Sequence, residues 1–295
     1  MKVQNERLGL QAGSLALLTA ILWGGNSVAI KIALAGFPPL AIAFIRFFLG
    51  GLTVWIWARA IGVSLKMVPG EKKPLFGLAT LFFFQIYLLN SGTHHTLAGR
   101  STVLISTHPF FTATFAHFFL LGDRLTRLKI LGMALSLAGV ALIFSESLLL
   151  GAHPYLIGDG MVLLSAVLLG GRQVYLKRLT QNMHPARILI WQAGLSLPAF
   201  LLLSLLFERD FPFAIDASIL SALLYQGLVI AGFCFIILTS LIRRHQASKL
   251  AVFGFITPVF GVLLSKFLLG EGLSSALLSG MVLVAIGIAI VNHES

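Results

Sequence analysis

Two stretches in different halves of the chain decide the fold. Residues 18–31 read LTAILWGGNSVAIK, and residues 164–177 read LSAVLLGGRQVYLK, at an offset of 146 residues. The same offset relates Pro39 to Pro185. A match of this length at a fixed offset indicates an internal repeat, and a repeat sets the architecture before any single motif does.

The repeat continues toward the end of each half. ISTHPFF at 105–111 aligns with GFITPVF at 254–260, and GMALSLAGVALI at 132–143 aligns with GMVLVAIGIAIV at 280–291. The offset is 149 for the first pair and 148 for the second, which corresponds to a slip of one residue. The match therefore runs through both halves of the chain.

The composition is that of a protein embedded in a membrane. Of the 295 residues, 58% are hydrophobic and 11% are charged, and the mean hydropathy is +0.96. A soluble domain carries about 25% charged residues, so this chain has too few to cover a surface that faces water everywhere. An ordinary soluble enzyme and a disordered protein are excluded.

Apolar stretches recur along the chain, each close to the roughly 20 residues that a helix needs to cross a bilayer. We predict an all-α membrane protein with ten transmembrane helices, at residues 10–30, 39–58, 75–93, 101–121, 128–149, 155–176, 187–207, 218–242, 247–269 and 273–291. Five spans fall in a first repeat, 1–149, and five in a second, 150–295. Because five is odd, the second repeat is inverted relative to the first. Two inverted five-helix repeats are typical of secondary transporters, whose substrate site lies near the midplane between the repeats.

Lysine and arginine are distributed unevenly between the two predicted membrane faces. With a cytoplasmic N-terminus, 15 of the 21 basic residues fall at inner loops and ends. This bias predicts a multi-pass protein of the cell (inner) membrane with both termini in the cytoplasm. The basic residues flank spans and do not form one module, so no nucleic-acid partner is expected. The expected partners are the bilayer and a small-molecule substrate, and the oligomeric state is left open between monomer and homodimer.

The duplicated motifs resemble a known family. In each half a small-residue motif is followed by a proline and then by Leu-Leu-Gly and an acid: Ala98, Ser101, Pro109, Gly122 and Asp123 in the first, and Ala247, Ala251, Pro258, Gly270 and Glu271 in the second. This pattern resembles the EamA-type repeat of the drug/metabolite transporter superfamily, over essentially the whole chain. The resemblance implies an inner-membrane carrier, most often an exporter of amino acids and related metabolites, but it does not carry over a substrate. The first repeat departs from the second by one extra residue and by Asp in place of Glu.

Polar residues deep in apolar spans are the candidates for substrate binding. They are costly in a bilayer unless they face the bundle interior or a water-filled cavity. We predict a substrate site lined by Trp23, Asn26, Gln85, Tyr87, Asn90, His108, Arg172, Gln173 and Thr257.

Several of these residues also have a structural interpretation. The Gly24-Gly25 pair would permit close helix packing, with Trp23 as an interfacial anchor. Arg172 binds a substrate carboxylate or instead extends to the cytoplasmic face. Arg46 has no acid near it in sequence, and it fits either hydrogen bonds to backbone carbonyls or a substrate role.

Gating and proton coupling are assigned to the fourth and ninth spans. Pro109 and Pro258 are predicted gating residues, because proline removes a helix hydrogen bond and frees a carbonyl. His108 is the candidate proton carrier, because histidine as a residue type titrates near neutral pH, with a hydrogen bond to a neighbour as the alternative. No Asp or Glu lies in the middle of a predicted span, so coupling rests on histidine, on substrate exchange, or does not exist.

We predict a secondary transporter that exports an amino acid or a related zwitterion by alternating access. The alternatives are an exporter of cationic drugs, and an exchanger or importer of another metabolite. An enzyme is not expected, because there is no His-Glu-x-x-His motif and no nucleophile–base pair on one helix face. No metal site and no cofactor are expected, and a channel lacks a ring of charge or a filter-like loop.

Overall fold

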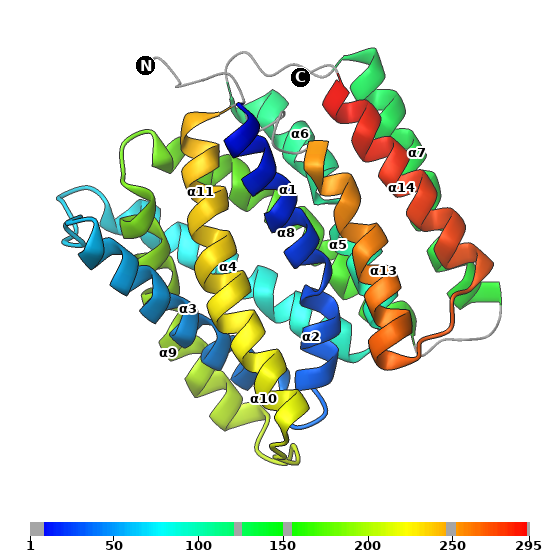
Figure 1. Ribbon diagram of the computed structural model, residues 1–295, viewed down its shortest axis with the longest axis horizontal. Coiled ribbons are helices and arrows are strands. Elements are labelled where there is room, and N and C mark those ends of the chain that lie inside the picture. Colours follow the sequence, from blue (N-terminus) through cyan, green and yellow to red (C-terminus); the bar gives the residue numbers. More distant parts are fainter. Residues whose placement is uncertain (1–8, 121–125, 150–154, 246–251, 294–295) are drawn as a thin grey trace.

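The computed structural model describes residues 9–120, 126–149, 155–245 and 252–293, which form a bundle of helices (Figure 1). Their bounds are α1 Leu10–Gly24, α2 Asn26–Ala33, α3 Pro39–Ala60, α4 Lys72–His94, α5 Ala98–Ile105, α6 His108–Phe119, α7 Arg127–Leu149, α8 Leu156–Thr180, α9 Pro185–Phe207, α10 Ala217–Leu224, the π-helix η2 Tyr225–Cys234, α11 Phe235–Arg244, the 3-10 helix η3 Val252–Phe255, α13 Ile256–Leu269 and α14 Ser275–His293. Gly122, Asp123, Ala247, Ala251 and both termini lie outside the described residues.

The helices are those of a membrane protein. Within the described residues, six segments are long and apolar enough to cross a bilayer: Leu10–Ala33, Pro39–Ala60, Lys72–His94, Leu156–Thr180, Pro185–Phe207 and Ala217–Arg244. Shorter apolar helices cover Ile130–Ser145, Ile256–Leu269 and Ser275–Ile290. Large side chains such as Phe48, Trp55 and Phe267 are exposed, whereas in a soluble protein such residues would form the core. The predicted all-helical membrane class is therefore confirmed.

In the described residues, four of the predicted spans are not single α-helices. The first divides at Gly25 into α1 and α2, and the fourth divides at Ser106 and Thr107 into α5 and α6. Pro109 lies in the first turn of α6, where its missing N–H costs no helix bond, so a new helix begins there. The eighth contains the ten-residue π-helix η2 between α10 and α11, which the hydrophobic pattern did not predict. The ninth contains the 3-10 helix η3 before α13.

Contacts between the two halves follow the internal repeat. α3 packs on α9 and α7 on α14, and the repeat aligns the two members of each of these pairs. The contact of α6 with α8 corresponds to that of α13 with α1, which are the aligned segments of the other half. The two halves therefore share one core.

The duplicated glycines lie at two of these equivalent contacts. A Cβ on Gly24 would lie 2.8 Å from Phe260 Cβ, and a Cβ on Gly170 would lie 2.6 Å from Phe111 Cβ. Phe111 and Phe260 are themselves aligned by the repeat. The glycine pairs thus permit close helix–helix approach, which is the structural interpretation weighed above.

The lysine that ends each quoted stretch also has an equivalent role. Lys31 Nζ donates to Thr93 O at 3.1 Å and to Thr96 O at 2.6 Å, at the C-terminal end of α4. Lys177 Nζ donates to Ile242 O at 2.8 Å, at the C-terminal end of α11. Each ammonium thus satisfies carbonyls that a helix end leaves without partners.

Candidate functional site

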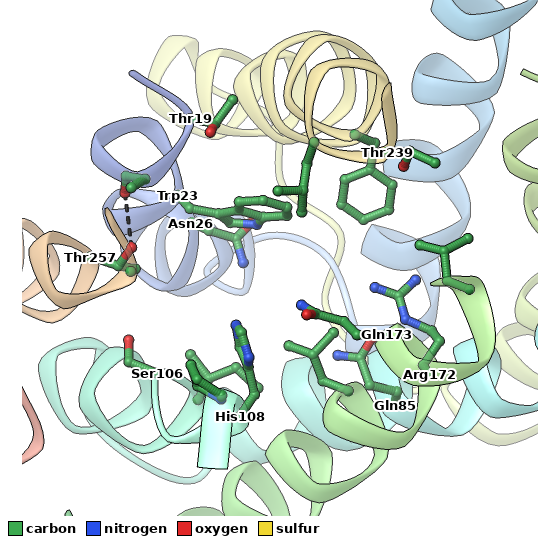
Figure 2. Close-up of a pocket in the computed structure, with 18 of the residues that line it drawn as sticks. Thr19, Trp23, Asn26, Gln85, Ser106, His108, Arg172, Gln173, Thr239 and Thr257 are labelled. Carbon is green, nitrogen blue, oxygen red and sulfur yellow. Dashed lines mark hydrogen bonds between the residues drawn. The ribbon is translucent and has the colours of Figure 1, made fainter. Parts of the chain in front are cut away.

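A cavity of about 160 Å³ lies within the bundle and is lined from both halves of the chain (Figure 2). The first half contributes residues of α1 to α6, and the second half contributes residues of α8, α9, α11 and the segment 253–257. Figure 2 shows Trp23, Asn26 and Thr257 on one side of the open space and Arg172 and Gln173 across it. The cavity is thus built between the repeats.

Most of the residues predicted for the site line this cavity. They are Trp23, Asn26, Gln85, His108, Arg172, Gln173 and Thr257, together with the predicted gating residue Pro109. Thr257 also donates its hydroxyl hydrogen to Ala20 O at 3.0 Å, which joins the ninth predicted span to α1 (Figure 2).

Three predicted residues are not among the described residues that line the cavity. Tyr87 packs in an apolar cluster, with its ring stacked on Phe83 at 6.5 Å between centroids. Asn90 is fully buried and donates from Nδ2 to Pro39 O at 2.9 Å, so it joins α4 to the start of α3. Pro258 is buried in the first turn of α13. In this structure these three residues pack helices together.

Other polar residues of the cavity were not in the predicted set. They are Thr19, Ser27, Arg46, Ser106, Gln192 and Thr239. The repeat relates Arg46 to Gln192 and Asn26 to Arg172, so each aligned pair holds one guanidinium and one amide. Following the repeat from Arg46 leads to Gln192.

Two arginines give the cavity its charge. The side chains of Arg46 and Arg172 are almost completely buried, with 1% and 7% of the residue surface exposed. Arg46 Nε and Nη1 and Arg172 Nε have no hydrogen-bond partner among the described residues. Arg172 therefore does not extend to a membrane face, and these Arg46 atoms do not bond to backbone carbonyls.

Aromatic rings, not carboxylates, surround the two guanidinium groups. Arg46 Cζ lies 5.0 Å from the centroid of Phe47, and Arg172 Cζ lies 5.0 Å from that of Phe82. The Phe47 and Phe82 rings are themselves 4.5 Å apart. Cation–π attraction offsets part of the cost of burying these charges but leaves their N–H donors unused.

The cavity also contains acceptors without donors. Asn26 Oδ1, Gln85 Oε1 and His108 Nδ1 are buried and have no hydrogen-bond partner in the described residues. Gln85 Nε2 is fixed by donation to Ser165 Oγ at 3.1 Å. Buried polar atoms are rarely left without partners, so unused donors and acceptors around one cavity are typical of a binding site.

At one end of the bundle, carboxylates of the second half reach into the first half. Asp159, in the first turn of α8, forms a fully buried ion pair with Arg100 of α5. Glu208 accepts from Leu40 N at 3.0 Å, and Glu271 accepts from Ala98 N at 2.7 Å. Arg100 is itself buried, so this ion pair is shielded from solvent.

A bundle of long apolar helices around a polar, positively charged cavity defines a multi-pass membrane transporter. The chain belongs to the EamA-like transporter family, whose model matches it twice, over residues 11–145 and 156–293. The resemblance to EamA-type drug/metabolite transporters is therefore confirmed.

Relatives match over nearly the whole chain. A Salmonella typhimurium protein named "probable amino-acid metabolite efflux pump" is 30% identical over 286 residues, covering 94% of this chain and 93% of the relative. An uncharacterized transporter of Bacillus subtilis, YvbV, is 30% identical over 290 residues, covering 95% of this chain and 92% of the relative. A solved crystal structure shares the fold with a TM-score of 0.69 at 23% identity, over 96% of each chain.

Proposed function

We propose that this protein is an inner-membrane secondary transporter that exports a small carboxylate-bearing metabolite of the amino-acid class by alternating access. The observation that carries the proposal is the cavity between the two halves, with buried, unpartnered Arg46 and Arg172 donors. The name of the Salmonella typhimurium relative supports the direction and the substrate class. Transport without catalysis is part of the proposal, because the lining hydroxyls of Thr19, Ser106 and Thr257 each donate to a backbone carbonyl in the part of the chain that the structure describes.

The proposed topology has ten spans in two inverted repeats, 1–149 and 150–295, with both termini in the cytoplasm. The two matches to the family model and the paired helix contacts support the two repeats. The start of α1 and the end of α14 lie at the same end of the bundle (Figure 1), as an even number of crossings requires. The proposal is equally compatible with a monomer and a homodimer.

Alternating access is proposed to move the two repeats relative to each other around the cavity. The bonds of Asp159, Glu208 and Glu271 to the first half would close the outer end in this conformation. Pro109 and Pro258 begin helical segments and are proposed as the points where these segments bend. His108 faces the cavity and is proposed as the proton site if transport is coupled to protons (Figure 2).

A cationic drug is a poorer substrate for this site. The described lining residues contribute two guanidinium groups and no carboxylate, so a cation would be repelled in a low-dielectric cavity. Exchange or import of another metabolite uses the same site, and only a measured direction of transport separates these modes from export.

The test is counterflow in proteoliposomes loaded with a panel of amino acids and their derivatives, with and without a pH gradient. Saturable counterflow of a carboxylate-bearing compound is expected, and efflux from everted vesicles gives the direction. Flux that does not saturate would contradict the carrier mechanism and favour a channel. Transport of cationic drugs alone would contradict the substrate class.

A further inference from the structure

The charge of the cavity is not balanced by the protein. Arg46 and Arg172 both line it, and the described lining residues include no Asp or Glu. We infer that the transported species carries a net negative charge, that its carboxylate binds both arginines, and that the neutral Gln192 sets this preference. The inference rests on the proposed transport function and narrows its substrate to anionic carboxylic acids, ahead of zwitterions.

The first argument is the position of the two guanidinium groups. Phe47 contacts Arg46, Phe82 contacts Arg172, and the two rings touch each other with centroids 4.5 Å apart. Phe235 lies next to Arg172 as well, with its ring centroid 5.7 Å from Cζ. One aromatic cluster therefore contacts both guanidinium groups and places them at the same wall of the cavity, and the proposed carboxylate binds there.

The second argument is the set of unused donors. Arginine offers five N–H donors in a planar fork that matches the two oxygens of a carboxylate. Arg46 Nε and Nη1 and Arg172 Nε are buried without partners. A substrate carboxylate supplies acceptors for both groups at once, whereas a neutral ligand leaves two buried charges uncompensated.

The third argument concerns the amino group of a zwitterion. An ammonium would cancel the charge that the carboxylate brings, and no described lining residue offers it a counter-ion. The unpartnered acceptors, Asn26 Oδ1 and Gln85 Oε1, are neutral, and a neutral N–H or O–H donor satisfies them. The site therefore suits an acid whose second polar group is a neutral amide or hydroxyl donor in preference to a free ammonium.

Gln192 is the residue that keeps the wall cationic. Arg172 Nη1 donates to Gln192 Oε1 at 3.3 Å, and Gln192 is itself buried. Glutamate has nearly the same shape as glutamine, so Gln192→Glu would place a carboxylate beside Arg172 without removing the hydrogen bond. That variant would neutralise one of the two cations from within the protein.

The experiment measures the half-saturation concentration in counterflow for three probes, namely glutamate, N-acetylalanine and alanine. The wild-type protein is expected to prefer the two net-anionic probes over zwitterionic alanine by about tenfold or more, since a hydrogen bond to a charged group contributes about 1.5–3 kcal/mol. Arg46→Gln and Arg172→Gln should each raise half-saturation for the anionic probes by about 10- to 100-fold. Gln192→Glu should lower the half-saturation concentration for alanine relative to that for the anionic probes. A variant that is only destabilised would not gain a preference for alanine.

The matched control is Arg187→Gln, which removes a guanidinium outside the cavity lining. Arg187 pairs with Glu71 at 2.7 Å and is not among the described lining residues. The Arg187→Gln variant should therefore select between the three probes as the wild type does. Equal transport of alanine and the anionic probes by the wild type, with Gln192→Glu unchanged, would overturn the inference and leave the proposed function standing. No counterflow of any of the three by monodisperse protein would contradict both.

Discussion

The buried arginines of this protein fall into two kinds that the sequence alone does not separate. Arg100 is bonded to Asp159, donates from Nη2 to Ile143 O at 2.7 Å, and lies beside the Tyr155 ring. Within the described residues, Arg46 and Arg172 have neither a carboxylate partner nor a full set of hydrogen bonds. Fully satisfied charges hold a structure together, whereas unsatisfied charges around a cavity are available to a ligand.

Removing one member of the Arg100–Asp159 pair should therefore affect stability before transport. Arg100→Gln removes the guanidinium from the buried Asp159 carboxylate, to which Thr96 Oγ1 still donates at 2.6 Å, and we expect the free energy of unfolding to fall by about 3–5 kcal/mol. Arg100→Gln with Asp159→Asn removes both charges and should recover part of that loss. Thermal unfolding in detergent measures both variants, and a double variant less stable than the single one would contradict the interpretation of a coupled pair.

His184 provides a pH dependence outside the membrane-spanning helices. It precedes α9, and its Nδ1 accepts from Ala186 N at 3.2 Å, which requires an unprotonated Nδ1. Partial burial, with the nearby Arg243 and Arg187, lowers the pKa of His184 below its ordinary value of 6.5. The unfolded chain then binds the proton more readily, so the contribution is fully present above about pH 6.5 and is lost as the pH falls through the folded pKa.

The measurement is the unfolding midpoint between pH 7.5 and pH 5 for the wild type and for His184→Asn. Asparagine caps a helix without titrating, so the variant should keep about 1 kcal/mol of capping that the wild type loses in acid. The difference between the two proteins should grow as the pH falls. A difference that stays constant over this range would count against the cap.

At the residue scale, the sequence predicted which types of side chain form the site better than it predicted which of them face the cavity. Gln85 lines the cavity, while Tyr87 and Asn90 on the same helix do not. The sequence predicted all three residues for the site, but the rotation of a helix that is apolar on most sides is set by its neighbours. Only the packed structure supplies that rotation.

At the scale of elements, the duplicated glycines show how a sequence motif fixes helix packing. Gly24 contacts α13 and Gly170 contacts α6, each at a distance that no Cβ tolerates without movement. Small residues allow such backbone approach in membrane bundles. The helix breaks beside the cavity follow from Gly25 and Pro109, which the sequence displays, whereas η2 depends on tertiary packing and was not predictable.

We expect Gly170→Ala to destabilise the protein by about 1–3 kcal/mol, because the new methyl group would overlap Phe111 and the backbone nitrogen of Thr112. The control is Gly160→Ala in the same helix, where an added Cβ meets nothing within 4 Å. That control should be neutral or stabilising by up to about 1 kcal/mol, since alanine favours helix over glycine. Similar unfolding midpoints for the two variants would show that the α6–α8 contact yields without cost.

For the whole molecule, the repeat predicts the architecture, and the positions where the two repeats carry different residues form the charged part of the site. The aligned lysines, Lys31 and Lys177, have equivalent roles at helix ends. The pairs Asn26/Arg172 and Arg46/Gln192 differ in charge, so each half supplies one arginine to the shared cavity. The repeat was readable from the sequence, but the meeting of these four residues was not, because they come from four different helices.

The proposed inversion makes a prediction about the two faces of the membrane. Lys73 lies in the first turn of α4, and Asp210 follows the end of α9. Five proposed spans separate the two residues, so they should lie on opposite faces of the membrane. Both side chains are exposed, and Cys234 is buried and is replaced by alanine as background. A membrane-impermeant maleimide should label Asp210→Cys in spheroplasts and Lys73→Cys only in inverted vesicles.

The two cysteines test different parts of the topology. Labelling of Lys73→Cys from outside and Asp210→Cys from inside would keep the odd number of crossings and reverse the orientation that the basic residues predict. Labelling of both from the same face would contradict five spans per repeat. Without that odd number the second repeat would not be inverted, and exchange of conformations between two equivalent halves would lose its structural basis.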